Sequence, residues 1–536
     1  LSNAYVWYDW ISQPQPSQGT SKDEIARLKQ DLSLAIQSVS SYVERSDTLV
    51  ILAPSTIHED RVHSKTGRKI HTCYRTWRRR GLCLLEMFSC FLSRRKTHPM
   101  LLIRSEIEGP IWISSHECLK LAVGEAEFTC CETNHRGHDG TSSMTCVRSV
   151  ALDILHTMID SKKKDLVAKN DVVLARFFVV LEQFWSRGLV ERKSKSSVLK
   201  LKMFKKILHW NEDLEGEWID RGNVSLLEYA SCMDRVELVG EILESIKDKR
   251  ELINHQIPRK GFVEVGLPGH ATALIAAMVF GSRNVVELLL ESGADPHIAD
   301  KNGVDPFMCA CVHGRTDNVI FWTRHFQNWN LKSRNKLGGT ALMCAVAMGP
   351  NRSNLVKYLL DQGAEADDVS YNGTSVLMTA CTNEDAEPKV IELLLKELTR
   401  ENINLRIRAT TNTWRGIYLI SKLMARSGLN QSMIVKRLAE RQGCTSLHYA
   451  ARRGDLELVE LLLSHGADPC IKDDRGKSVQ DACMSFPELR GMLEKRERMM
   501  RLRDTRRKTN AVEALGKRMS TATPLQHDMW LISFET

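Results

Sequence analysis

The sequence lacks a hydrophobic run long enough to suggest a membrane span. Its longest apolar stretches, residues 81–92 and 172–184, are short or interrupted by charge, whereas a membrane helix needs ~20 apolar residues. No basic segment followed by an apolar core opens the chain, so we expect no signal peptide. The first residue is Leu1, not Met, which suggests a fragment or an incomplete gene model. Gly-rich phosphate loops, of the Gly-x-x-x-x-Gly-Lys or strand-linked Gly-x-Gly-x-x-Gly type, are also missing.

Cysteine and charge indicate the compartment and the surface. With no export signal, the 15 cysteines are expected to be reduced thiols of the cytosol or nucleus. We therefore expect a cytoplasmic protein, with a nuclear location as the alternative. The net charge of +9 is mild for 536 residues. Basic residues cluster at 78–80, 94–96, 162–164 and 495–508, and such clusters are usually solvated surface.

A repeated pattern fills the second half of the chain. The segment Thr445-Ser446-Leu447-His448 is followed by an apolar run at 458–463 and then by Gly466. Gly443 and Gly476 lie 33 residues apart, and related copies begin near residues 272 and 338. A Thr or Ser hydroxyl can cap the first helix, the apolar run gives one buried face to the second, and the glycine ends it.

These segments closely resemble ankyrin repeats, because three landmarks recur in order at the period of that family. The resemblance implies a mainly α-helical solenoid that binds a partner through its concave surface. We expect six or seven repeats over 223–489, including a divergent one at 406–442, and a hydrogen-bonding role between turns for His448. The predicted partner-binding residues lie in the turns: Arg334, Lys336, Tyr371, Asn372, Lys472 and Arg475.

The first hundred residues alternate between strand and helix patterns. A β-rich run at 5–8 precedes a loop with two prolines, and residues 22–45 have helical periodicity. Residues 47–53, in which 49–53 are continuously apolar, are expected to form a strand buried on both faces of a parallel sheet. A long polar loop, a helix at 81–93 and a strand at 100–103 are expected next. Such alternation predicts a doubly wound α/β sheet.

This order resembles the Toll/interleukin-receptor-like (TIR-like) family, which has a flavodoxin-like fold, over roughly residues 5–105. Its marks are Trp7-Tyr8-Asp9-Trp10, then Ser46-Asp47 before the apolar run, and Cys83-Leu84-Leu85-Glu86. In catalytic members the glutamate of a Trp-Cys-x-x-Glu motif serves NAD cleavage. The resemblance implies that role for Glu86, with Asp9 and Ser46 as pocket residues. Here Leu82 replaces the tryptophan, and the strand that should precede Tyr5 is missing, so the domain is expected to be truncated.

Residues 106–222 connect the two units. Cys130, His135, His138 and Cys146 could ligate zinc as thiolates and imidazoles, although their spacing matches no familiar finger, and a loop with free thiols explains them equally. We therefore do not favour a metal, and expect no cofactor unless NAD is a substrate. Helices expected at 149–164 and 172–187 carry aromatic residues that should dock on the first repeat.

The tail, residues 490–536, begins with a strongly basic helix. Three interpretations stay open: a solvated extension of the solenoid, a nuclear-import or nucleic-acid patch, or a helix that enters a calmodulin-like groove or meets an anionic membrane. The sequence as a whole favours a protein-binding adaptor in intracellular signalling, with self-association through the N-terminal unit, over a nucleic-acid binder. The alternative is a TIR-like NAD hydrolase in which the repeats serve as a targeting arm.

Overall fold

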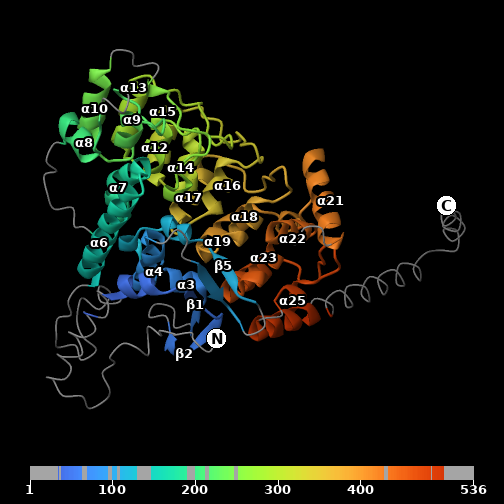
Figure 1. Cartoon of the computed structure of the whole chain (residues 1–536). Helices are drawn as coiled ribbons and strands as arrows, with labels where there is room; N and C mark the ends of the chain where they lie inside the picture. Colours follow the sequence, from blue (N-terminus) through green and yellow to red (C-terminus); the bar gives the residue numbers. More distant parts are fainter. Residues whose placement is uncertain are drawn as a thin grey trace, which may run out of the picture.

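The computed structural model describes residues 34, 38–62, 69–94, 99–105, 109–128, 147–189, 199–211, 217–246, 252–427, 432–483, 486–499 and 502. Figure 1 shows a curved helical array with a smaller unit that contains strands beside it. The expected strand at 5–8 and most of the expected helix at 22–45 lie outside the described residues, where only 38–45 are seen as helix.

The N-terminal unit contains a small mixed sheet. Strands β1 (Leu49–Leu52) and β4 (Met100–Ile103) pair in parallel, which confirms the two strands expected there. Strand β5 (Ile111–Ile113) runs antiparallel to β4, so the described sheet is not purely parallel. Helix α4 (Gly81–Leu92) forms where expected and is buried along almost its whole length.

Two expectations for this unit were wrong. The polar loop expected after β1 contains the antiparallel pair β2 (Thr56–Val62) and β3 (Lys69–Thr72), followed by helix α3 (Tyr74–Arg78). The apolar run of β1 is buried on one face only: Ile51 is buried, whereas Val50 and Leu52 are exposed. In the described part of the chain no element covers the face of Val50, so this strand is not sandwiched between two layers.

The connecting region packs on the first repeat, as expected. After the 3-10 helices η1 (Ser115–Lys120) and η2 (Val123–Glu125) come α6 (Val147–Ala168), α7 (Val172–Trp185) and α8 (Leu201–Ile207). Phe177 of α7 lies 4.8 Å, between ring centroids, from Tyr229 of the first repeat. The buried Arg176 guanidinium pairs with Asp220 at 2.9 Å, and Asp220 also accepts a hydrogen bond from the Tyr229 hydroxyl. These contacts join the connecting helices to the array.

The array consists of stacked helix pairs. The first helices are α9 (Leu226–Ser231), α12 (Ala273–Val279), α14 (Pro306–His313), α16 (Ala341–Ala347), α18 (Val376–Thr382) and α23 (Ser446–Arg453). Their partners are α10 (Val236–Ser245), α13 (Arg283–Glu291), α15 (Thr316–His325), α17 (Ser353–Asp361), α19 (Pro388–Glu397) and α24 (Leu456–Ser464). Short elements are η3 (Val263–Val265), α20 (Arg400–Ile403) and α25 (Val479–Ala482), and a helix at 487–499 follows.

Local chemistry fixes where these helices begin and end. Thr272 and Asp305 accept hydrogen bonds from backbone amides in the first turns of α12 and α14, which caps both helices. Gly293 and Gly466, with φ of 96° and 95°, follow the second helices α13 and α24 in the left-handed conformation that glycine adopts without strain. The landmarks of the repeated pattern are therefore structural.

The divergent segment 406–442 is not a stacked repeat, which corrects our expectation. We expected helices near residues 418–426 and 432–441 within this segment. Helices α21 (Asn412–Ser427) and α22 (Met433–Ala439) form there, but they pack mainly on each other. Helix α23 packs directly on α18, and α24 packs on α19, so the array continues without a gap. The segment is an insertion that leaves the array and returns to it, and α21 stands away from the other helices in Figure 1.

Candidate interaction surface

Turns between consecutive repeats form a continuous ladder, which we call the finger side (residues 269–270, 300–303, 335–338, 370–373, 408–410, 442–443 and 473–476). The backbone amide of Lys336 donates to Asn302 at 3.0 Å, and that of Tyr371 donates to Leu337 at 3.0 Å. Thr410 continues the ladder by donating to Tyr371 at 3.1 Å. Each turn therefore holds its neighbours in register, and the side chains on the tips are presented by a rigid backbone.

In the turns at 300–303 and 473–476, the aspartate at the start of the turn closes it from inside. Asp300 Oδ1 accepts hydrogen bonds from the amides of Asn302 and Val304, both at 2.8 Å. Asp473 Oδ1 does the same for Arg475 and Lys477, both at 2.9 Å. Burial acts to raise the pKa of Asp473, but these amides and Arg475 outweigh it and hold the pKa below its usual value.

Four of the predicted partner-binding residues hold these turns together. Arg334 donates to the carbonyl oxygens of Gly338 and Val369 and pairs with Asp368. Lys336 donates its Nζ proton to the Lys301 carbonyl at 2.7 Å. Asn372 Oδ1 accepts a hydrogen bond from the Thr374 amide, and Tyr371 contributes its backbone to the ladder. In the structure these residues bind their own or neighbouring turns, so a role in partner binding stays a prediction.

The last finger contains the other two predicted residues. Lys472 is exposed, whereas Arg475 pairs with Asp473 and with Glu440 at 2.9 Å each. The neighbouring Asp474 is the point where the finger meets the inserted helices.

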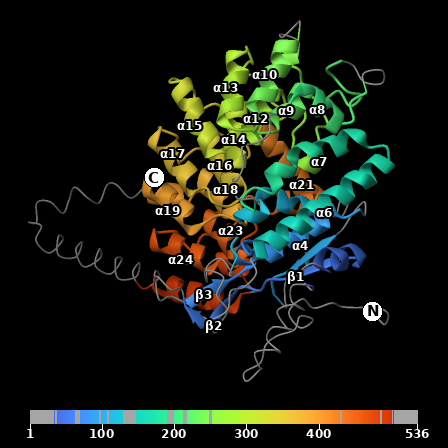
Figure 2. The ribbon, with the colours of Figure 1, turned by 90° about the vertical axis from the view of Figure 1, so that its left-hand side faces the viewer.

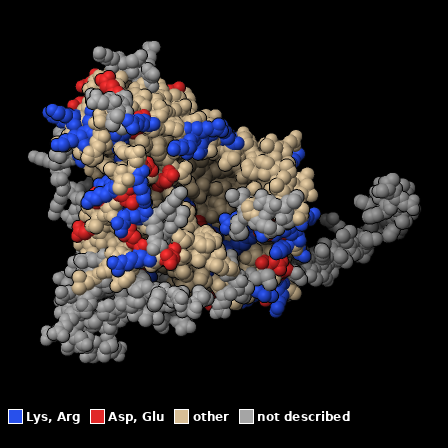
Figure 3. Space-filling view, in the orientation of Figure 1, with Lys and Arg blue, Asp and Glu red and all other residues tan. Residues whose placement is uncertain are grey.

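Sequence reasoning missed the basic cluster around Asp474. Arg406, Arg408 and Lys422 lie 2.9, 3.4 and 4.0 Å from its carboxylate oxygens. One carboxylate thus faces three cations, which leaves this surface positive. Figure 3 shows Lys and Arg side chains gathered where the inserted helices meet the array, next to a hollow in the surface. The signal in the sequence was the excess of basic residues in 406–442, which has a single acidic residue, Glu440.

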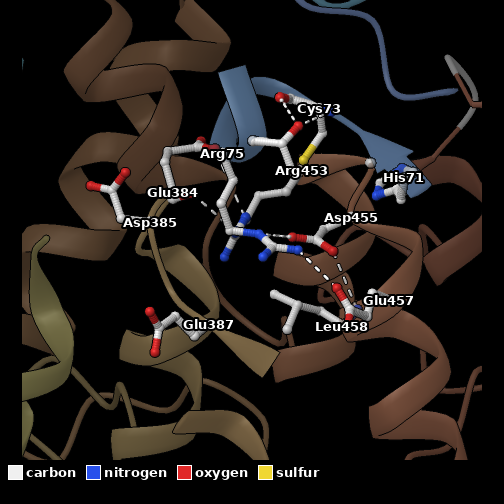
Figure 4. A network of polar contacts seen from close by, with 12 residues as sticks. His71, Cys73, Arg75, Glu384, Asp385, Glu387, Arg453, Asp455, Glu457 and Leu458 are labelled. Atoms are coloured by element: carbon white, nitrogen blue, oxygen red, sulfur yellow. Dashed lines mark hydrogen bonds and ion pairs between the residues drawn. The ribbon is translucent and has the colours of Figure 1, made fainter. Parts of the chain in front are cut away.

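The opposite edge of the array is covered. We call it the loop edge: the loops that join the two helices of each pair, at residues 314–315, 348–352, 383–387 and 453–455. Arg75 of α3 reaches Asp455 and Glu457 at 3.2 and 3.0 Å (Figure 4). Arg78 of the same helix reaches Asp385 at 3.0 Å. Arg79–Glu387 and Arg104–Glu384 pairs extend the contact.

Several ion pairs of this contact are buried, which strengthens the attraction between their charges. Arg78 is only 2% exposed, so the basic cluster expected to be solvated surface at 78–80 is largely interface. Burial opposes the charge of Arg75, but Asp455 and Glu457 outweigh it and raise its pKa. Burial likewise acts to raise the pKa of Asp455, yet Arg75 and Arg453 bring it below the usual value. Figure 2 shows the N-terminal unit and α6–α7 lying against this edge of the array.

The predicted catalytic residues are not brought together among the described residues. Glu86 is buried within α4, and Asp9 lies outside the described residues. Ser46 donates its hydroxyl proton to the Tyr42 carbonyl at 2.7 Å. A cavity of about 560 Å³ near this serine is lined by Ser41, Glu44, Arg45 and Arg94 instead. A catalytic role for Glu86 therefore stays a prediction.

The zinc candidates Cys130, His135, His138 and Cys146 also lie outside the described residues. Within the described residues no group of histidine, cysteine and acidic side chains is arranged to hold a metal ion. No helix in the same part of the chain is both long and apolar enough to cross a membrane.

Comparison with known families identifies the repeats. The ankyrin repeat family matches residues 270–301 and 442–474, and the family of three consecutive ankyrin repeats matches 323–407. The stretch between the matched segments 323–407 and 442–474 contains the inserted helices α21 and α22.

Curated relatives share the repeats over part of their length. Ankyrin repeat protein nuc-2 of Neurospora crassa is 28% identical over 209 residues, which cover 37% of this chain and 18% of nuc-2. The B-cell lymphoma 3 protein homolog of Mus musculus is 27% identical over 205 residues, covering 38% of this chain and 37% of the relative. The solved ankyrin repeat domain of Bcl-3 is covered fully by 51% of this chain, at 21% identity and a TM-score of 0.33. The chain thus spans well under half of these curated relatives.

Proposed function

Because this chain carries ankyrin repeats, we propose that it is a protein-binding scaffold whose finger side receives the partner. The observation that supports the proposal most directly is the unequal use of the two edges of the array. The N-terminal unit occupies the loop edge through buried ion pairs, whereas the finger side carries exposed side chains such as Leu337 and Lys472. A rigid ladder with exposed tips suits recognition, because little conformational entropy is lost on binding.

Site-specific crosslinking tests this proposal. A photoreactive amino acid replaces Leu337 on a finger tip, or Lys396 on the outer helix α19, in the full chain expressed in its own cell type. Both side chains are exposed, so the two positions are matched in access. We expect a crosslinked protein from position 337 and none from position 396. Equal crosslinking from both positions, or crosslinking from 396 alone, would contradict binding at the finger side.

We propose further that the N-terminal unit self-associates through the open face of its sheet. Val50, Leu101 and Trp112 lie in register across β1, β4 and β5, and Trp112 is 68% exposed. An exposed apolar row of this kind favours burial against a second copy. Sedimentation of the full chain should show a dimer that Trp112→Asp converts to monomer. A chain that stays monomeric at high concentration would exclude this interface.

A further inference from the structure

One finger of the array has been replaced by a helical hairpin. The two legs of the insertion pair where they leave the array, since Ile407 donates its amide proton to Cys444 and Gly443 donates to Ile407. The Tyr418 hydroxyl then donates to the Asn372 carbonyl of the neighbouring finger at 2.9 Å. Helix α21 therefore begins at the rung of the ladder formed by Thr410, and stands where the other repeats present a tight turn.

Helix α21 has one buried face and one exposed apolar face. Tyr418 and Ser421 are buried against the array and α22. Leu419, Ile420 and Leu423 are 60%, 56% and 57% exposed. Leu419 and Leu423 are spaced i, i+4, and Ile420 and Leu423 are spaced i, i+3, so these three side chains form a single apolar patch. A contiguous exposed patch of this kind marks an interaction site more often than scattered apolar residues do.

Positive charge lies along one flank of this patch. Arg415, Lys422 and Arg426 follow one another at helical spacing beside Leu419 and Leu423. Arg415 donates only to the Ala409 carbonyl and the Asn412 side chain among the contacts of the described residues, and neither neutralises its charge. Together with the cluster at Asp474, where three cations face one carboxylate, this flank would attract the carboxylates of a partner.

We propose that α21 binds an amphipathic helix of a partner protein, one that carries Leu-type residues on one face and Asp or Glu along its flank. The inference rests on the proposed function and names the chemistry of the partner at one finger. A helix laid along α21 would bury the apolar patch and bring its carboxylates to the basic flank. A helix that binds along another helix contacts apolar residues spaced i, i+3 and i+4. The charges on the flank then fix the orientation of the bound helix.

The probe is a synthetic amphipathic peptide as long as α21, with leucines on one face and glutamates on its flank. Its binding to the full chain is measured by fluorescence anisotropy. A second peptide has lysine in place of every glutamate and is otherwise identical. We expect the acidic peptide to bind at least about tenfold more tightly than the basic one, with affinity that falls as salt rises.

Variants locate the binding site. Leu419→Asp with Leu423→Asp should weaken binding of the acidic peptide at least about tenfold, because both apolar contacts are lost. Arg415→Glu with Arg426→Glu should remove the preference for the acidic peptide while the apolar patch is intact. Val167→Asp is the matched control, since Val167 is a similarly exposed apolar residue on α6. It should leave binding unchanged, and circular dichroism should show that all variants stay folded.

Four results would overturn the inference. The acidic peptide could bind no better than the basic one, or bind the Leu419→Asp, Leu423→Asp variant equally well. The patch could instead bind vesicles of anionic lipid and not the peptide. Finally, α21 could pair with a second copy of itself, seen as a dimer that Leu423→Asp dissociates. If crosslinking from Leu337 still succeeds in any of these cases, the scaffold function stands and only the partner's chemistry at α21 is wrong.

Discussion

At the scale of single residues, arginines of the same unit differ in what they contribute. Arg78 is buried and paired with Asp385, whereas Arg94 pairs with Glu44 at an exposed site. Removing one member of a buried pair leaves the other charge without a counterion, which costs about 3–5 kcal/mol. We expect Arg78→Met to lower the free energy of unfolding by that amount in urea denaturation.

The matched control is Arg94→Met. Solvent screens an exposed ion pair, which therefore contributes little to stability, so this variant should unfold near the wild-type midpoint. The double variant Arg78→Met, Asp385→Leu should recover part of the loss, since neither charge is then buried alone. Equal, small effects of both single variants would show that the contact at the loop edge is weak.

Two histidines, the buried His448 and the half-buried His313, make the fold sensitive to acid. Burial, helped by Arg352 and Arg315, lowers the pKa of His313 to about 3, and burial lowers that of His448 to about 4. Between these values and the ordinary 6.5, the unfolded chain binds more protons than the folded one. The stability of the fold with both histidines neutral is therefore fully present above pH ~6.5. It is lost as the pH falls toward 3 to 4.

Each of these histidines should add a slope of about 1.4 kcal/mol per pH unit to the free energy of unfolding below pH ~6. Urea unfolding at pH 6 and pH 5 measures the slope. His313→Asn should reduce the slope by one histidine's share, whatever its effect on stability at pH 7. An unchanged slope in that variant would mean that His313 titrates normally in the folded protein.

Which residues could be assigned from sequence depends on how far apart their partners lie. A Thr or Ser hydroxyl was expected to cap the first helix of a repeat, and Thr272 accepts a hydrogen bond from the amide of Ile275, three residues away. Arg78 was assigned to the surface because Asp385, its partner, is 307 positions away. No pattern within the first hundred residues points to an acid that far along the chain. Short-range caps are therefore predictable, and the ion pairs of the loop edge are not.

At the scale of helices and loops, the insertion at 406–442 is the feature that we predicted wrongly from the sequence. Gly373 and Gly443 are 70 residues apart, which equals two repeats and suggested a repeat between them. The helices were placed correctly because α21 has its own apolar periodicity. The sequence could not show whether these helices stack in the array. A spacing of two repeat lengths fits both a stacked repeat and an enlarged finger.

Deletion distinguishes these two arrangements. Replacing residues 411–440 by a short glycine-containing turn should leave the array folded, because α23 already packs on α18 and α24 on α19. We expect the melting temperature to fall by only a few degrees, from the loss of Tyr418 packing near Ile407. The same deletion should abolish binding of the acidic peptide.

The control deletion removes residues 340–371, which contain the stacked helices α16 and α17. Removing these helices takes a stretch out of the continuous core, so thermal melting should show a much larger loss than for the insertion. If the two deletions destabilise the protein equally, then α21 and α22 carry stacking contacts and the insertion interpretation fails.

At the scale of the whole molecule, the chain has one occupied edge and one open edge. The period of 33 residues was enough to predict the solenoid, since each repeat contacts mainly its neighbours. The docking of the N-terminal unit could not be predicted, because it depends on α3, which lies in a stretch expected to be loop. The sheet was predicted in part: β1 and β4 were correct, but the antiparallel β5 and the exposed face were not.

The central claim is that the finger side binds the partner while the loop edge stays closed. Hydrogen exchange of the full chain tests it most directly, measured alone and with the protein that crosslinks to position 337. The account predicts slower exchange in the fingers at 334–339 and 370–374 and in α21, with no change in α3. Slower exchange in α13, α15 and α17, the second helices of their pairs, in place of the fingers would contradict it. So would faster exchange in α3 as the N-terminal unit detaches.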